Sequence, residues 1–95
     1  MIVVGMDHFL SICKKKLVEW YNEVFEEMSV YSQQEIDLSH VYVVWCCKTL
    51  QNYKALLSTS VSGDGIYVEF TYNGDREELY MDVYRKLLNC KHTEE

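Results

Sequence analysis

Apolar residues recur at steps of three and four along the first third of the chain. Steps of this size keep side chains on one face of an α-helix, so the pattern predicts a helix over residues 7–31. Asp7 stands where an N-cap side chain would accept hydrogen bonds from the first turn. Phe9, Tyr21 and Phe25 widen the apolar stripe enough for burial along the whole helix. The stripe itself consists of Leu10, Cys13, Leu17, Trp20, Val24 and Met28.

Three segments rich in β-branched and aromatic residues follow a polar connection at residues 32–39. They cover residues 40–48, 53–61 and 65–73, and their composition predicts three strands. Residues 62–65, Ser-Gly-Asp-Gly, include two glycines that accept positive φ angles. They predict a hairpin turn between the second and third strands.

The last predicted element is a second helix over residues 75–88. Asp75 is its expected N-cap, and Glu78 follows at the spacing of a capping box. Its buried face would consist of Leu79, Tyr80, Val83, Tyr84, Leu87 and Leu88. The order α-β-β-β-α predicts an α+β fold, a three-stranded antiparallel sheet with two helices packed on one face. We expect a single domain over residues 1–95, with residues 1–5 as an N-terminal extension or an extra short strand.

Strand register predicts which sheet face stays open. A two-residue turn at residues 63–64 would pair Leu57 with Phe70 and gather the apolar residues on the face that the helices cover. The opposite face would then show Ser60, Ser58, Leu56, Tyr67, Glu69 and Thr71.

The first strand is apolar on both faces. If a three-residue loop at residues 50–52 follows it, the core receives Val41, Val43, Trp45 and Cys47. The open face then receives Tyr42, Val44 and Cys46, and a one-residue slip would exchange the two sets. An edge strand that is apolar on both sides needs a cover. The candidates are residues 2–4, a second copy of the chain or a different partner.

The composition is that of an ordinary soluble globular protein: of 95 residues, 48% are hydrophobic and 25% are charged. The longest apolar run, residues 41–47, is far shorter than the ~20 residues of a membrane span. The N-terminus lacks the basic flank and long apolar stretch of a signal peptide. These features predict a soluble, intracellular protein that binds no membrane.

The net charge of −6 disfavours binding to nucleic acid or to an anionic membrane. Between Leu17 and Cys47 the chain has six acidic residues and no lysine or arginine. They are Glu19, Glu23, Glu26, Glu27, Glu35 and Asp37. This acidic stretch is either an ordinary solvated helix face or a surface that meets a basic partner.

Candidate catalytic chemistry is sparse. Cys46 and Cys47 are adjacent, so within a strand they point to opposite faces and do not bridge each other. The spacing of Cys and His residues fits no common metal site, and no phosphate-binding glycine loop occurs, so we expect no metal and no cofactor. A small enzyme using Cys46 or Cys47 with His40 is an alternative with less support, because neither thiol stands beside a basic cluster.

Eight tyrosines in 95 residues is a high number. Tyr and Trp combine a large contact area with few rotatable bonds, and protein interfaces are enriched in them. Most of the tyrosines are expected in the core with the hydroxyl reaching water. Tyr42 and Tyr67, on the predicted open face, are the candidates for an interface.

Two segments carry a resemblance to a known family. They are residues 41–59, which include Lys-Thr-Leu-Gln-Asn, and residues 64–75, which include Thr-Tyr-Asn-Gly-Asp, together with the segment that follows. Over roughly residues 7–91 the chain resembles a small uncharacterised family encoded by bacteriophages and prophages of Gram-positive bacteria. The resemblance implies a phage accessory protein acting in the host cytoplasm, and it implies no activity, cofactor or catalytic residue.

The predicted layout is also similar to two other groups. Double-stranded-RNA-binding domains share the α-β-β-β-α order, but their last helix starts with a lysine cluster, whereas residues 75–78 read Asp-Arg-Glu-Glu. Small acidic anti-CRISPR proteins, which occupy basic nucleic-acid channels as mimics, share the acidic character. Both are likenesses of layout alone.

We therefore predict a non-enzymatic, phage-derived protein-binding module that inhibits a host defence or nucleic-acid-handling protein, such as a nuclease. No direct contact with nucleic acid is expected. One alternative is a homodimeric structural or accessory phage protein, with the first strand or the open sheet face as its self-interface. Another is a double-stranded-RNA-binding-like module. The predicted partner-binding residues are Glu19, Glu23, Glu26, Glu27, Glu35, Asp37, Tyr42, Val44, Leu56, Tyr67 and Glu69.

Overall fold

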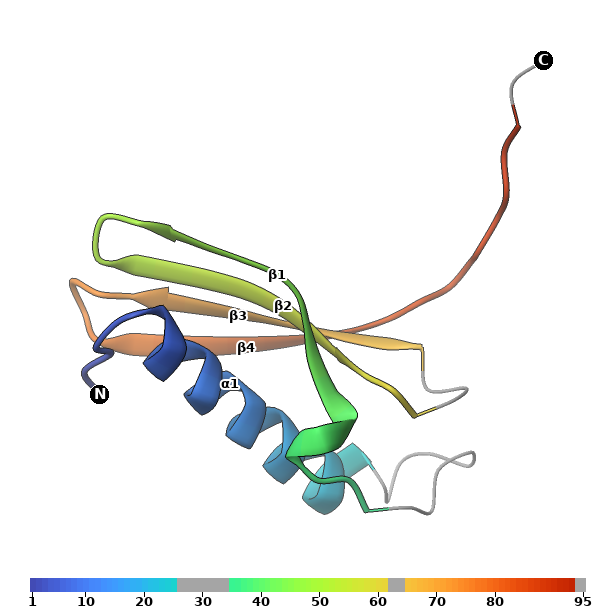
Figure 1. Ribbon diagram of the computed structural model, residues 1–95, viewed down its shortest axis with the longest axis horizontal. Coiled ribbons are helices and arrows are strands. Elements are labelled where there is room, and N and C mark those ends of the chain that lie inside the picture. Colours follow the sequence, from blue (N-terminus) through green and yellow to red (C-terminus); the bar gives the residue numbers. More distant parts are fainter. Residues whose placement is uncertain (26–34, 62–64, 94–95) are drawn as a thin grey trace.

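A four-stranded antiparallel sheet with one α-helix packed on its face forms the fold in the computed structural model (Figure 1). The structure describes residues 1–25, 35–61 and 65–93, apart from the side chains of residues 24 and 25. The helical elements are α1 (Met6–Trp20), a π-helical turn η1 (Tyr21–Phe25) and a 3₁₀ turn η2 (Leu38–His40). The strands are β1 (Val41–Thr49), β2 (Asn52–Thr59), β3 (Ile66–Asn73) and β4 (Glu78–Arg85). The sheet order is β1-β2-β3-β4, so each strand pairs with its neighbour in sequence.

Helix α1 buries one row of side chains spaced by four residues: Phe9, Cys13, Leu17 and, where η1 begins, Tyr21. Leu10 and Trp20, which the pattern assigns to the buried stripe, are half-buried. The expected N-cap is wrong: Gly5, at φ 93°, holds that position, and Asp7 lies inside the first turn. The Phe9 N–H already donates to the Gly5 carbonyl (3.0 Å), so helical hydrogen bonding starts before Asp7. The predicted C-terminal end of the helix lies outside the described residues.

The prediction of a second helix and a three-stranded sheet is wrong, because the last segment forms the fourth strand, β4. Asn73 decides this locally: its side-chain oxygen accepts hydrogen bonds from the N–H groups of Asp75 (3.0 Å) and Arg76 (3.3 Å) and stabilises a turn. Asp75 and Glu78 therefore belong to a hairpin rather than to a helix N-terminus. Side chains alternate between the two faces of the sheet along β4. Leu79, Met81 and Val83 point to the helix side, and Tyr80, Asp82 and Tyr84 point to the opposite side.

The pairing of β2 with β3 keeps the predicted faces but changes the predicted partners. Ala55 lies opposite Phe70 and Leu57 opposite Val68, two residues from the expected alignment. Because side chains alternate with a period of two, this shift leaves each on its expected face. The turn predicted at residues 63–64 lies outside the described residues. The sheet face toward α1 buries Tyr53, Ala55, Leu57, Ile66, Val68, Phe70 and Tyr72.

Strand β1 contains a β-bulge between Val43 and Trp45 that the sequence pattern does not predict. Val43 lies on the core face, opposite Leu57, whereas Trp45 lies on the other face, opposite Leu56. A bulge adds one unpaired residue, so it exchanges the faces of everything that follows. The expected placement of Trp45 and Cys47 in the core is therefore wrong. The loop to β2 has two residues instead of the three considered from the sequence.

The N-terminal segment, residues 1–4, is irregular and contacts the end of the sheet where β3 turns into β4. The Tyr72 hydroxyl donates a hydrogen bond to the Met1 carbonyl oxygen (2.9 Å), and the Met1 amino group lies 3.9 Å from the Glu77 carboxylate. This segment therefore provides neither an extra strand nor a cover for β1.

Candidate functional site

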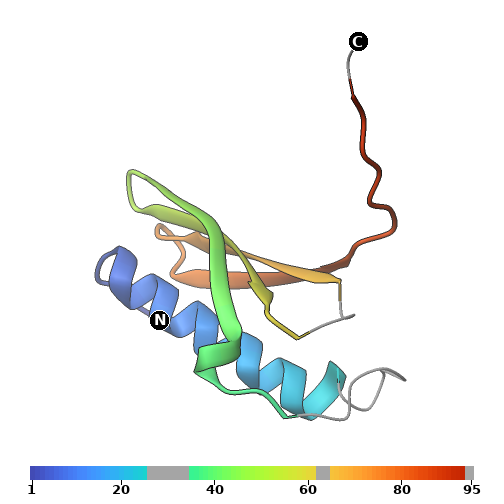
Figure 2. The same cartoon turned by 45° about the vertical axis from the view of Figure 1, so that its right-hand side comes forward.

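The candidate site is the sheet face that points away from α1, which we call the open sheet face. Figure 2 shows the helix on one side of the sheet and no other described element over the opposite side. Alternation along the strands assigns its residues, because Ala55, Leu57 and Val68 point toward the helix. The open sheet face consists of Tyr42, Trp45, Cys47, Lys54, Leu56, Ser58, Tyr67, Glu69, Thr71, Glu78, Tyr80, Asp82 and Tyr84.

Aromatic side chains from three strands dominate this face. Tyr42 is 47% exposed, Trp45 41%, Tyr80 52% and Tyr84 53%. Tyr67 lies directly opposite Tyr84, so these two rings are cross-strand neighbours. Tyr and Trp are the residues that contribute most at protein interfaces, and an exposed group of them marks a binding surface.

The polar groups on the open sheet face are engaged with one another. Lys54 Nζ lies 3.6 Å from Glu69 Oε1, across the pairing of β2 with β3. The Tyr80 hydroxyl donates a hydrogen bond to the Glu78 carboxylate, and this bond raises the pKa of Tyr80. The Lys86 ammonium group lies 5.9 Å from the centroid of the Tyr67 ring on this face. Three carboxylates, those of Glu69, Glu78 and Asp82, still outnumber the two ammonium groups of Lys54 and Lys86, so the described residues form no positively charged groove here.

The acidic side chains predicted to meet a basic partner lie elsewhere. Glu19 and Glu23 are exposed on α1 and η1, in the layer on the other side of the sheet (Figure 1). Glu35 is exposed shortly before η2. Glu26 and Glu27 lie outside the described residues. The structure thus separates the acidic part of the predicted site from its aromatic part.

Asp37 has a structural role that the sequence pattern does not indicate. Its carboxylate accepts hydrogen bonds from the Ser39 hydroxyl and the Ser39 N–H (2.8 Å), while His40 Nδ1 accepts one from the Asp37 N–H (3.1 Å). Together these contacts form a capping box around η2. The hydrogen bonds from Ser39, aided by the nearby His40, lower the pKa of Asp37. This residue holds the chain where it enters β1.

Four predicted binding residues share the open sheet face, namely Tyr42, Leu56, Tyr67 and Glu69. Val44 stands at the bulge of β1 and is 43% exposed. Sequence reasoning missed Trp45, Tyr80 and Tyr84. The signal for the two tyrosines is the alternation along residues 79–84, whereas the bulge that turns Trp45 outward has no comparable signature.

The candidate catalytic thiols and His40 serve other roles or lie on the surface. All four cysteines are free, and Cys46 and Cys47 point to opposite faces of β1, as expected. His40 Nδ1 takes part in the capping box. Cys13 is buried in the core, and this burial raises the pKa of its thiol to about 12. Such a thiol supplies almost no nucleophilic thiolate at neutral pH.

A metal site or a membrane-spanning helix would indicate a different kind of function. In the described part of the chain, no cluster of three or more His, Cys, Asp or Glu side chains could hold a metal ion. None of the helices described there is long and apolar enough to cross a membrane.

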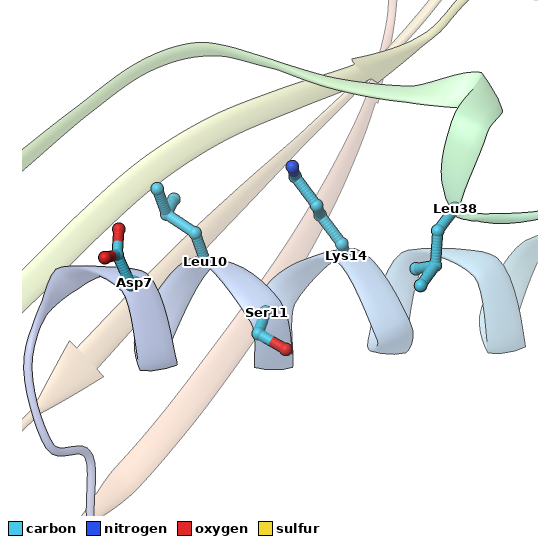
Figure 3. A pocket seen from close by; sticks show the side chains of 5 residues that line it. All are labelled: Asp7, Leu10, Ser11, Lys14 and Leu38. Carbon is cyan, nitrogen blue, oxygen red and sulfur yellow. The ribbon is translucent and has the colours of Figure 1, made fainter.

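A shallow hollow of about 270 Å³ lies between α1 and η2 (Figure 3). Figure 3 shows Asp7, Leu10, Ser11 and Lys14 lining it from α1, with Leu38 of η2 at one end. Ligand pockets typically measure ~300–1,000 Å³ and combine an apolar wall with a few convergent polar groups. This hollow has one isolated acid and one isolated base, so the open sheet face remains the better candidate.

Comparison with known proteins places the chain among sequences without an assigned activity. Residues 10–94 match a family described as a family of unknown function, DUF6275. No curated protein and no solved structure matches the chain. The comparisons support neither a phage origin nor a likeness to anti-CRISPR proteins.

Proposed function

We propose that this chain, which belongs to the family of unknown function DUF6275, is a non-enzymatic module that binds a partner protein on its open sheet face. The observation that carries the proposal is the group of exposed aromatic rings on that face, from Tyr42 and Trp45 on β1 to Tyr80 and Tyr84 on β4. Burying such rings supplies most of the binding free energy at many protein interfaces. Catalysis is not needed to explain this surface.

The charge of the face favours a protein over a nucleic acid as the ligand. Sheet faces that bind single strands also carry aromatic residues, but they add a positively charged groove that follows the phosphates. Here Lys54 is paired with Glu69 at 3.6 Å, and the Lys86 ammonium group over the Tyr67 ring is outnumbered by the carboxylates of Glu78 and Asp82. The net charge of −6 strengthens the repulsion of a polyanion.

A finer form of the proposal concerns the identity of the partner. The acidic residues between Leu17 and Cys47 attract a basic protein surface, and nucleic-acid-handling proteins such as nucleases present basic channels to the phosphates. In this form the chain is an inhibitor of phage origin that acts in the host cytoplasm. Glu19 and Glu23 would accelerate the encounter from the helix layer, and the open sheet face would provide the close contact.

Photo-crosslinking from single positions tests the proposal and identifies the partner in the same experiment. p-Benzoylphenylalanine replaces Tyr42 or Tyr84 on the open sheet face, and it replaces Lys15, exposed on α1, in a matched control chain. After irradiation in a lysate of the host cell, we expect the same protein to be attached at Tyr42 and at Tyr84. The Lys15 control should not capture it.

Three results would contradict the proposal. The first is equal capture at Lys15, and the second is no capture at Tyr42 and Tyr84. The third is an adduct that nuclease removes, which would identify a nucleic acid as the ligand. The finer form predicts that Glu19→Gln combined with Glu23→Gln slows association at low salt, so an unchanged association rate would remove the steering role.

A further inference from the structure

Strand β4 is the last strand of the sheet, and one side of its backbone points away from β3. The Lys86 N–H donates to the Gly65 carbonyl (2.6 Å), so the even-numbered residues of β4 direct their backbone groups toward β3. By the same alternation Leu79, Met81 and Val83 direct theirs outward. A row of outward N–H and C=O groups is a template for pairing with another strand.

The two edges of the sheet differ in how they are protected. β1 has the bulge between Val43 and Trp45, and bulges at edges disfavour pairing with another chain. β4 pairs with β3 regularly from Glu78 to Arg85, and its sequence contains neither proline nor lysine. β4 is therefore the edge that accepts a further strand more readily.

The inner face of β4 is only partly covered by the helix layer. Val68 and Phe70 on β3 are fully buried, whereas Val83 on β4 is 39% exposed, and Leu79 and Met81 are half-buried. A hollow of about 450 Å³ lies at the start of β4, lined by Met1, Lys16, Phe70, Glu77, Leu79 and Met81. Apolar side chains from outside this single chain would complete the layer.

The C-terminal residues 86–93 continue beyond β4 and extend away from the rest of the molecule (Figures 1 and 2). Leu87 is 96% exposed and Leu88 is 78% exposed.

We propose that two copies of the chain pair their β4 strands antiparallel, about a two-fold axis at Met81, into one continuous sheet. An axis perpendicular to the sheet keeps both helices on the same side of the continuous sheet. Because the axis lies at Met81, whose backbone groups point outward, the outward-directed residues of the two strands pair with one another. Leu79 then lies opposite Val83 of the second copy on the helix side. Tyr80 lies opposite Asp82 of the second copy on the open sheet face.

Charge selects this register among its neighbours. An axis at Asp82 would set the two Asp82 carboxylates opposite each other, and an axis at Tyr80 would set Glu78 opposite Asp82. Like charges directly opposite each other destabilise a strand pair. With the axis at Met81, Glu77 of one copy instead lies near Arg85 of the other at both ends of the pair.

The same register brings Val83 and Met81 of each copy beside the hollow of the other, opposite Leu79 and Met81 of its lining. The dimer goes beyond the proposed function, because it requires no partner protein and joins two open sheet faces into one surface.

Sedimentation equilibrium of the full chain tests the proposal, and we expect twice the 11.3 kDa of one chain. Met81→Lys should give the single-chain mass, because it sets two ammonium groups together at the axis. The matched control is Val44→Lys on the opposite edge, which should leave the dimer intact. Circular dichroism confirms that each variant is folded.

Cysteine cross-linking provides a second test that does not depend on the folding of Met81→Lys. The starting chain has Cys46, Cys47 and Cys90 replaced by serine. In that chain Met81→Cys sets two thiols across the axis, with Cα atoms ~5.5 Å apart, a separation that a disulfide spans. Copper phenanthroline with oxygen should oxidise this pair to a disulfide and yield a covalent dimer. Asp82→Cys and Val83→Cys, the register controls, should give only traces.

Three results would overturn the inference. They are the single-chain mass at every concentration, a folded Met81→Lys variant that remains a dimer, and faster cross-linking at Asp82→Cys or Val83→Cys than at Met81→Cys. A monomer that still gives photo-crosslinks to a partner from Tyr42 and Tyr84 would overturn the dimer and leave the proposed function standing.

Discussion

The ring of Phe9 stacks on the ring of Tyr53, with centroids 5.3 Å apart and planes inclined by 30°. Tyr53 in turn contacts Tyr72, whose ring centroid lies 6.2 Å away. All three residues are buried, so this row of rings joins the start of α1 to β2 and β3. Because the Tyr72 hydroxyl also binds the Met1 carbonyl, the row couples the helix, the sheet and the N-terminal segment.

Replacing Phe9 by alanine should lower the free energy of unfolding by about 3–5 kcal/mol, the range for removing a buried aromatic ring. The loss combines the transfer free energy of the ring with the cavity left beside Tyr53. Urea denaturation followed by tryptophan fluorescence measures it. Leu10→Ala, at the neighbouring half-buried position, is the control and should have less than half the effect. Equal effects would contradict the central place of Phe9 in the core.

The first helix could be predicted because its apolar residues repeat with a single helical period, and the first three strands because they are rich in β-branched and aromatic residues. The last element could not, because residues 79–88 satisfy two periods at once. Leu79, Val83 and Leu87 are spaced as on a helix, and Leu79, Met81 and Val83 alternate as on a strand. Tertiary structure decides between them, since β3 needs a partner for its second edge and the Asn73 side chain favours a hairpin. A local capping-box pattern does not outweigh that pairing.

The same reasoning applies to the candidate site. The sequence pattern predicts the face of Leu56, Tyr67 and Glu69 correctly, because a register error of two residues does not change faces. It predicts the wrong face for Trp45, because one extra residue in β1 does change faces and no local sequence signal reveals that residue. Tyr80 is missed because the sequence pattern predicts its segment as a helix rather than as a strand.

Native protein should contain three thiols that react quickly with Ellman's reagent and one that does not. Cys46, Cys47 and Cys90 are exposed, whereas Cys13 is buried and the pKa of its thiol is raised to about 12. Its reaction must therefore wait for the fold to open. Absorbance at the thionitrobenzoate band gives the number of reactive thiols, first for the native chain in buffer and then for the denatured chain in guanidinium chloride.

Cys13→Ala is the control for the thiol count. It should leave the native count unchanged and remove the thiol that reacts only after denaturation. A native count of four in the wild-type chain would contradict the burial of Cys13 against the sheet.

The capping box of Asp37 should give stability that depends on pH. The folded-state pKa of Asp37 is lowered, chiefly by the Ser39 hydroxyl, so its contribution is fully present above the unfolded-state pKa of ~3.9. The contribution is lost as the pH falls through the lowered folded-state value. We therefore expect Asp37→Asn to be less stable than wild type at neutral pH and to approach it in stability in acid. Urea midpoints measured over that pH range provide the comparison.

Ser39→Ala is the matched variant for this titration. Removing the hydroxyl should raise the folded-state pKa of Asp37, so the acid-dependent loss should begin at a higher pH than in wild type. Parallel profiles for wild type and Asp37→Asn at every pH would show that the carboxylate does not stabilise η2.

Deleting Val44 should leave the fold intact, because Val44 is the residue that the bulge adds to β1. Val43 and Trp45 pair with Leu57 and Leu56, which are adjacent in β2, so the deletion turns an interrupted ladder into a regular one. We expect the free energy of unfolding to change by no more than about 1 kcal/mol, as for a change confined to an exposed edge. Near-ultraviolet circular dichroism and urea denaturation measure both properties.

Deleting Leu56 instead removes a residue from a regular central strand, so everything on one side of the deletion must turn to the opposite face. That chain should lose its near-ultraviolet signal. If the Val44 deletion unfolds the protein as completely as the Leu56 deletion does, β1 pairs without an extra residue, and Trp45 belongs to the core face after all.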